Sequence, residues 1–162
     1  MRRVPAPQAA WALDGSARSA LGGTTLTLQR TCNWTEGHKD GTRALVIDRT
    51  CFATALHSSS LAFGASSISI CARLRSFNRG TRLISKMSND GYISRGLSVE
   101  LGDYRGLGIG FADAAGVSTH EELGRSDLAD GKWHHTCAIL QRKPRQVLSV
   151  YVDGRLSESL NL

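Results

Sequence analysis

The stretch that decides the fold class is VLSVYVDGRL, residues 147–156. Apolar residues alternate with Ser149 and Tyr151 as far as Val152, which is the period of a half-buried β-strand. Asp153-Gly154 then supplies a two-residue turn, and apolar character returns at Leu156. A strand followed by Asp-Gly and more apolar residues is the strongest short-range signal for a β-hairpin. We therefore expect an antiparallel hairpin at this point.

The same period of two recurs elsewhere along the chain. Further alternating runs lie at residues 25–28, 68–74, 97–101 and 107–111. Turn signals separate them, at Asp14-Gly15, Gly22-Gly23, Asp40-Gly41, Asn89-Asp90-Gly91 and Asp130-Gly131. Only residues 119–128 could form a helical turn or two. Short alternating strands with glycine turns predict an all-β sandwich or barrel.

Length and composition exclude several classes of protein. The chain has 162 residues, 41% of them apolar and 21% charged, which suits one ordinary globular domain rather than a disordered chain. No apolar run approaches the roughly 20 residues of a membrane helix, so an integral membrane protein is not expected. The first residues are basic but lack the apolar segment of a signal peptide. We expect either a cytosolic protein or a piece of a longer exported one.

The charge balance favours anionic partners. Lys and Arg number 20 against 14 Asp and Glu, a net charge of +6. The densest stretch is Arg73, Arg75, Arg79, Arg82 and Lys86, which on alternating strands would lie mainly on one face or in the following turn. A solvated sheet face is the favoured explanation of this stretch, since exposed sheet faces are normally polar. No RNA-binding aromatic signature or helix-turn-helix pattern accompanies the charge, so we expect no nucleic-acid partner.

Six motifs together resemble one family. Asp130-Gly131-Lys132-Trp133-His134-His135 followed by Tyr151-Val152-Asp153-Gly154 matches the pair "D-G-K-W-H-H … Y-V-D-G" of LamG-like jelly-roll (concanavalin A-like lectin/glucanase) domains. Weaker matches to the same family lie at residues 11–15 (WALDG), 41–48 (GTRALVID), 56–61 (LHSSSL), 67–75 and 83–86 (LISK). One departure stands out: Arg73 occupies the position of the Trp in the family's "S-A-W-V-K" strand.

The resemblance implies an architecture and a function class. The fold would be an all-β, two-sheet antiparallel jelly-roll sandwich, with residues 1–10 as an N-terminal extension and residues 11–162 as the domain. The function would be that of a non-catalytic binding module, carbohydrate-binding or adhesive like a lectin. The alternative is a structural or protein-interaction accessory domain of a larger surface protein or glycan-active enzyme. The location would be extracellular or at the cell surface as part of a longer chain, while a cytoplasmic location stays open.

Candidate ligand contacts follow from the same resemblance. The sandwich face or its loop rim would hold a glycan, and arginines would bind acidic groups on it. A tyrosine in a loop could stack on a sugar ring. The candidates are Arg73, Arg75, Asn89, Asp90 and Tyr92, and an ordinary exposed residue is the alternative for each.

Calcium is the one candidate cofactor. Family members sometimes hold it through loop carboxylates, and Asp48, Asp90 and Asp103 are available here. Calcium prefers several oxygen ligands at once, and the spacing of these three residues does not show that they converge.

The motif residues themselves predict structural roles. They are Trp11, Asp14, Trp133, His134, His135, Tyr151, Asp153 and Gly154. His134 and His135 are neighbours on a strand and point to opposite faces, so they cannot hold one metal ion together. We expect one of the two to be half-buried and hydrogen-bonded. The two Asp-Gly pairs are turn residues first.

Catalysis is not expected. A retaining glucanase needs two carboxyl groups about 5 Å apart, which E-x-D-x-x-E on one strand would supply. No such run exists: Glu100 and Asp103 lie three residues apart, and Glu121-Glu122 lie in a polar connector.

The cysteines predict no structural zinc site. Cys32, Cys51, Cys71 and Cys137 form no C-x-x-C pair and no cluster with histidine at metal-ligand spacing. Four cysteines allow three pairings, and a buried free thiol is the ordinary alternative. With no signal peptide but a fold common outside cells, we expect at most one disulfide. The favoured pair is Cys32 with Cys51, leaving Cys71 and Cys137 as buried thiols.

The end of the chain predicts an open sheet edge. The family continues after "Y-V-D-G" to a closing strand, whereas residues 155–162 provide one strand at most. We therefore expect an incomplete domain, whose free edge invites a partner strand or self-association. The alternative is that residues 9–13 occupy that edge.

Overall fold

A computed structural model gives the fold of the chain. It describes residues 9–21, 24–48, 50–57, 61, 66–89, 94–104, 106–112, 118–124 and 126–162. The chain divides into two compact units, Met1–Gly64 and Ala65–Leu162, called here the N-terminal and C-terminal units. The described part of the chain contains twelve β-strands and no α-helix, so it also offers no helix able to cross a membrane. The all-β prediction is confirmed.

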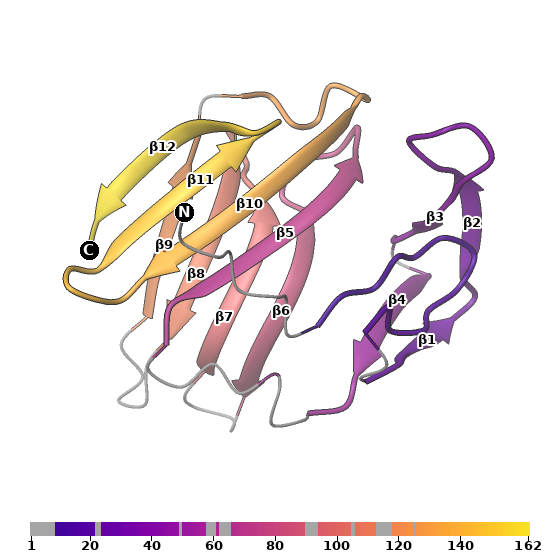
Figure 1. Cartoon of the computed structure of the whole chain (residues 1–162), viewed down its shortest axis with the longest axis horizontal. Coiled ribbons are helices and arrows are strands. Elements are labelled where there is room, and N and C mark those ends of the chain that lie inside the picture. The colour runs from indigo at the N-terminus through magenta and orange to yellow at the C-terminus, as the bar shows by residue number, and fades with distance from the viewer. Residues whose placement is uncertain are drawn as a thin grey trace. The chain divides into compact units, whose positions relative to one another are not determined.

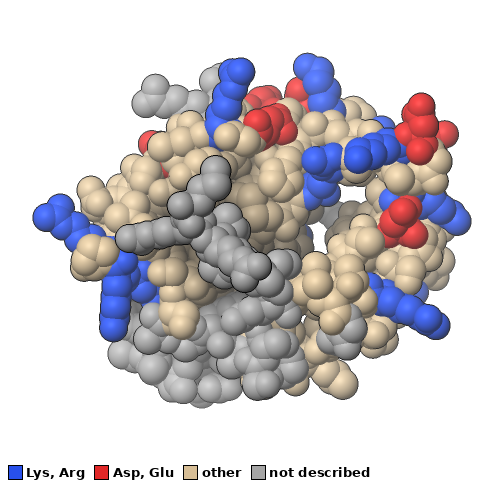
Figure 2. Space-filling model, viewed as in Figure 1, with Lys and Arg blue, Asp and Glu red and all other residues tan. Residues whose placement is uncertain are grey.

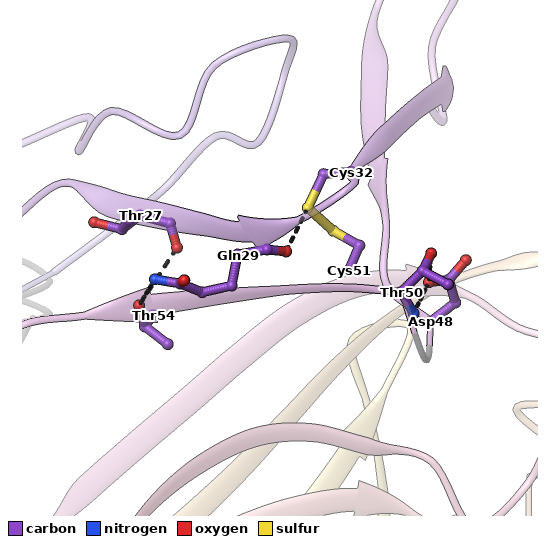
Figure 3. The surroundings of a disulfide bond; sticks show 7 residues. All are labelled: Thr27, Gln29, Cys32, Asp48, Thr50, Cys51 and Thr54. Atoms are coloured by element: carbon purple, nitrogen blue, oxygen red, sulfur yellow. Dashed lines mark hydrogen bonds between the residues drawn. A yellow bond between two sulfur atoms is a disulfide. The ribbon is translucent and has the colours of Figure 1, made fainter.

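The N-terminal unit contains two small antiparallel sheets. Strand β1 (Leu26–Arg30) pairs with β4 (Cys51–Ala55), and β2 (Asn33–Glu36) pairs with β3 (Arg43–Val46). A disulfide joins Cys32, just beyond β1, to Cys51 at the start of β4, with Cα atoms 4.8 Å apart (Figure 3). The predicted pairing of Cys32 with Cys51 is therefore confirmed.

The first motif residues hold this unit together. The indole Nε1 of Trp11 donates a 2.8 Å hydrogen bond to the carbonyl oxygen of Thr24, and Trp11 pairs with Ser19 in an isolated bridge. A carboxylate oxygen of Asp14 accepts a 2.6 Å hydrogen bond from the backbone N–H of Arg43, the first residue of β3. Trp11 thus closes the segment before β1 on itself, and Asp14 fastens that segment to β3.

The C-terminal unit is a sandwich of two four-stranded antiparallel sheets (Figure 1). The first sheet has the order β12-β11-β10-β5 and the second β6-β7-β8-β9. Their strands are β5 (Ile68–Arg75), β6 (Arg82–Asn89), β7 (Ser94–Leu101), β8 (Leu107–Ala112), β9 (Ser118–Leu123), β10 (Trp133–Gln141), β11 (Val147–Val152) and β12 (Arg155–Asn161). The predicted two-sheet sandwich is confirmed. Strands β5, β7, β8 and β11 coincide with alternating runs of the sequence to within three residues at each end.

The core lies between these two sheets. Apolar side chains of β5, β10 and β11 face apolar side chains of β7 and β8 across one narrow internal space. Val150 and Ile109, one from each sheet, have no exposed surface. Burying a side chain of this size stabilises a fold by about 1.5–3 kcal/mol. Because alternate residues of each strand fill this layer, the residues between them are on the outer faces.

The Asp-Gly hairpin forms as predicted. Asp153 and Gly154 both have positive φ angles, 50° and 79°, as the tight turn between β11 and β12 requires. The last segment is one strand, β12, which among the described strands pairs with β11 alone. Trp11, from the segment offered as an alternative occupant of that edge, pairs with Ser19 instead.

The helical turn expected within residues 119–128 is wrong. Residues 118–123 form strand β9, which pairs with β8. Gly110 lies opposite His120 and Gly108 opposite Glu122, and a Cβ atom at Gly108 would come within 3.0 Å of His120 Nε2. The bare glycines leave room for the bulky polar side chains of the neighbouring strand. Cross-strand pairing therefore overrides the local helical tendency of this segment.

The basic stretch is divided between β5, the loop after it and β6. Arg73 and Arg75 lie on the exposed face of β5, but Arg79 lies in the following loop, 2.6 Å from a carboxylate oxygen of Asp127. Arg82 belongs to β6 in the other sheet. The chain crosses between sheets after Arg75, which divides the stretch. Lys and Arg side chains are spread over the face drawn in Figure 2 rather than gathered in one region.

Candidate ligand-binding face

The outer face of β5 and β10 carries the most distinctive cluster of polar and aromatic side chains. The antiparallel register sets Trp133 opposite Arg75, His135 opposite Arg73 and Cys137 opposite Cys71. Directly opposite residues project from the same face of a sheet, and so do residues two apart on one strand. These six side chains therefore form three rows on one face, called here the β5–β10 face.

The first row joins a cation to an aromatic ring. The guanidinium carbon of Arg75 lies 5.2 Å from the centroid of the Trp133 ring. A cation–π contact at an exposed site stabilises by about 0.5–1 kcal/mol. Trp133 is half-buried and Arg75 exposed, so the pair presents a positive charge stacked on an aromatic ring. The second row adds the exposed side chains of Arg73 and His135.

The third row corrects the prediction of buried thiols. Cys71 and Cys137 form a disulfide with Cα atoms 4.1 Å apart, and no free cysteine is left in the chain. Cys71 is exposed and Cys137 half-buried. The expectation of at most one disulfide is therefore wrong.

The sequence held a signal for this pairing. Ile68 and Ile70 face the core, so Cys71 must face outward, and the buried Ala138 and Leu140 place Cys137 outward in the same way. What the sequence did not show is that β5 and β10 are neighbours in register, because 66 residues separate the two cysteines.

The motif histidine is held between two carboxylates. His134 Nδ1 lies 2.8 Å from Asp153 Oδ2, and His134 Nε2 lies 3.0 Å from Asp130 Oδ1. Asp153 also accepts a 2.8 Å hydrogen bond from the backbone N–H of His135, and Asp130 accepts one of 2.8 Å from that of Lys132. This arrangement is called here the His134 clamp. It ties the β11–β12 turn and the loop before β10 to the first residues of β10.

The clamp shifts all three pKa values. Burial lowers the pKa of His134, but hydrogen bonds to Asp153 and Asp130 and the charges of both carboxylates outweigh it and raise that pKa above 6.5. The backbone N–H of Lys132, and then the His134 side chain, lower the pKa of Asp130 to about 2. The backbone N–H of His135, and then the His134 side chain, lower the pKa of Asp153. These shifts favour the protonated imidazole, in which each ring nitrogen donates a hydrogen bond to one of the two carboxylates.

The remaining candidate residues are scattered. Asp90 and Tyr92 lie outside the described residues, and Asn89 ends β6, where its backbone pairs with Ser94. Asp48 accepts hydrogen bonds from the hydroxyl and the backbone N–H of Thr50, at 2.7 and 2.6 Å, which lower the pKa of Asp48. Asp103 lies beside Gly80 in the C-terminal unit.

The structure therefore gives no calcium ligand set among the described residues. Neither Asp48 nor Asp103 belongs to a cluster of potential metal ligands in the described part of the chain. Calcium binding stays a prediction, which the change in melting temperature on adding calcium or a chelator would test.

Comparison with known families identifies the fold. Residues 52–162 match a laminin-G-type family model described as the concanavalin A-like lectin/glucanases superfamily. The chain belongs to this superfamily. The match covers β4 from Phe52 onward and the whole of the C-terminal unit, including the β5–β10 face.

A solved structure shares the concanavalin A-like fold. It is the crystal structure of the binding domain of Paraclostridial Mosquitocidal Protein 1, with a TM-score of 0.69 and 15% sequence identity. The likeness covers 86% of this chain but only 36% of that structure. No curated protein matches the chain.

Proposed function

We propose that this domain is a non-catalytic, lectin-like module that binds an acidic glycan on its β5–β10 face. The observation that carries the proposal is the block of Arg73, Arg75 and His135, all exposed, with the half-buried Trp133 on the same sheet face. The superfamily includes lectins, and the solved structure of similar fold is that of a binding domain. Both make a binding role the expected one.

The chemistry of the block suits a sugar acid. A guanidinium donates two parallel hydrogen bonds to a carboxylate or sulfate, and an indole ring covers the apolar face of a sugar. Residues two apart on a strand lie about 6.8 Å apart and neighbouring strands about 4.8 Å apart. Arg73, Arg75 and Trp133 therefore lie within the span of one or two sugar rings.

Two further features support this proposal. Disulfides persist in oxidising compartments, so the two bridges in this chain favour an extracellular or surface location. The titratable cluster with resolved pKa shifts in this unit, the His134 clamp, is satisfied within the protein, which favours binding over catalysis.

A protein-interaction role is the second candidate, and strand β12 favours it. Among the described strands, β12 is hydrogen-bonded on one side only, and Leu156 at its start is 56% exposed. An exposed edge can accept a strand from another chain.

A glycan array with the intact, oxidised chain distinguishes the two roles. We expect binding restricted to glycans with carboxylate or sulfate groups, weakening steeply as salt is raised because the Debye length is only about 8 Å at physiological ionic strength. Binding to no glycan would overturn the proposal in favour of the protein-interaction role. Binding to neutral glycans alone would overturn the acidic specificity.

A further inference from the structure

Three potential metal ligands meet on the β5–β10 face. They are the Sγ atoms of Cys71 and Cys137 and a ring nitrogen of His135, all within 4.8 Å of one another. His135 Nε2 lies 3.9 Å from Cys137 Sγ. His135 and Cys137 are two apart on β10, and Cys71 lies across from Cys137 on β5. Thiolate sulfur with imidazole nitrogen is a donor set that zinc prefers.

The spacing of these atoms fits a tetrahedral ion. Zinc binds sulfur at about 2.3 Å and imidazole nitrogen at about 2.0–2.1 Å, so two ligands on one ion lie about 3.5–3.8 Å apart. The strands hold the two cysteine Cα atoms 4.1 Å apart, close to the roughly 4.5 Å of a non-hydrogen-bonded cross-strand pair. The residues before and after each cysteine also pair between β5 and β10. Breaking the disulfide would therefore leave the two thiols side by side.

The disulfide occupies both sulfur ligands, and it is accessible. Cys71 is exposed, so a thiol in solution can reach its sulfur. In the other disulfide Cys51 is only 1% exposed and Cys32 is half-buried, so neither half is as exposed as Cys71. Attack by a thiolate needs access to a sulfur atom, so a mild reductant should open Cys71–Cys137 first.

We propose that reduction of the Cys71–Cys137 disulfide creates a zinc site formed by Cys71, Cys137 and His135. A dithiol reductant supplies two electrons and two protons: the S–S bond breaks, two thiols form, and the dithiol becomes a disulfide. A zinc ion then displaces the two thiol protons and takes the neutral His135 nitrogen as its third ligand. At least one coordination position is left for water or an anion. The oxidised protein has no such site, so metal binding reports the redox state of this face.

This site is independent of the proposed glycan function. It uses the third row and one residue of the second, and its test involves no glycan. Failure of metal binding would leave the glycan proposal standing, and failure of glycan binding would leave the metal site standing.

Cobalt titration of the full chain tests the site. The protein is reduced with a phosphine, freed of reductant by desalting without oxygen, and titrated with Co²⁺. In the reduced chain, the thiolate-to-cobalt charge-transfer band and the visible spectrum of tetrahedral cobalt should rise until one Co²⁺ per chain is bound. Added zinc should remove both. The oxidised chain should give neither band. Absence of these bands, with Cys71 and Cys137 shown by mass spectrometry to be reduced, would overturn the proposal.

Variants assign the ligands. His135→Ala should weaken cobalt binding at least about tenfold. Mutating a residue that only hydrogen-bonds to a metal ligand already costs about 10–100-fold in metal affinity, so losing a ligand should cost no less. His120→Ala, which removes an exposed histidine from the other sheet, should leave the affinity unchanged. Equal affinities for the two variants would contradict the role of His135.

The cysteine ligands are tested in two ways. Cys71→Ser combined with Cys137→Ser should abolish the charge-transfer band, and a persisting band would assign it to Cys32 and Cys51. If that variant does not fold, the wild-type chain is mildly reduced, alkylated and mapped by mass spectrometry. Chains alkylated only at Cys71 and Cys137 should bind no cobalt, and retained binding would overturn the proposal.

Discussion

The carboxylate of Asp153 receives hydrogen bonds from two successive residues of β10, the His134 ring at 2.8 Å and the His135 backbone N–H at 2.8 Å. Asp153 is also the first residue of the tight turn between β11 and β12, with φ of 50°. One side chain therefore fixes the turn of the decisive hairpin to the strand beside it. The two halves of the most specific sequence motif meet at this contact.

Removing the Asp153 charge should destabilise the domain. Asn tolerates a positive φ and keeps one oxygen acceptor, so Asp153→Asn isolates the loss of charge from any strain in the turn. Because hydrogen bonds to charged groups contribute more than neutral ones, we expect a loss of about 1 kcal/mol in the free energy of unfolding by urea. Asp40→Asn, at another Asp-Gly turn, is the matched control. Equal stabilities for the two variants would show that the clamp contributes nothing.

The clamp should also give stability a specific dependence on pH. His134 has a raised pKa, so its contribution is complete below pH 6.5 and is lost as pH rises through the folded value. Asp130 and Asp153 have lowered pKa values, so theirs is complete above pH 3.8 and is lost as pH falls, for Asp130 through about 2. The stability difference between wild type and His134→Gln should therefore be largest between these limits. A difference that does not change from pH 3 to pH 9 would contradict the account.

Two glycines with positive φ should respond differently to substitution. A Cβ at Gly96, where φ is 132°, would lie within van der Waals overlap of the Lys86 backbone carbonyl. At Gly154, where φ is 79°, it would meet nothing within 4 Å. We expect Gly154→Ala to cost about 1–2 kcal/mol from backbone conformation alone. Gly96→Ala should cost more, because overpacking adds about 1–3 kcal/mol. The reverse order in urea unfolding would be inconsistent with the packing of β6 against β7.

Features set by neighbouring residues were predictable from the sequence, whereas features set by pairing between distant strands were not. The β11–β12 hairpin was predictable because its turn, period and partner all lie within residues 147–156. The outward direction of Cys71 was predictable from Ile68 and Ile70, but its partner was not, since the β5–β10 register joins segments more than 60 residues apart. The helical turn expected within residues 119–128 was wrong because strand β9 forms by pairing with the glycine-containing strand β8. The rows of the β5–β10 face were not predictable for the same reason, because they depend on the register of β5 with β10.

The free edge of β12 should promote association. Leu156 and Leu162 are both exposed, at 56% and 45%, beside backbone groups that no described strand pairs. We expect light scattering after size-exclusion chromatography to show species larger than a monomer, with Leu156→Lys shifting them toward the monomer because edge charges oppose strand pairing. A clean monomer at all concentrations would contradict an open edge.

The most direct test of the central claim is affinity for heparin, a defined acidic polysaccharide. We predict that Arg73→Ala combined with Arg75→Ala raises the dissociation constant at least about tenfold, since each lost charged hydrogen bond costs about 1.5–3 kcal/mol. Arg145→Ala combined with Arg155→Ala removes the same charge from exposed positions off the β5–β10 face and should change the dissociation constant much less. Equal losses for the two double variants would reduce the interaction to net charge and contradict a binding site on this face.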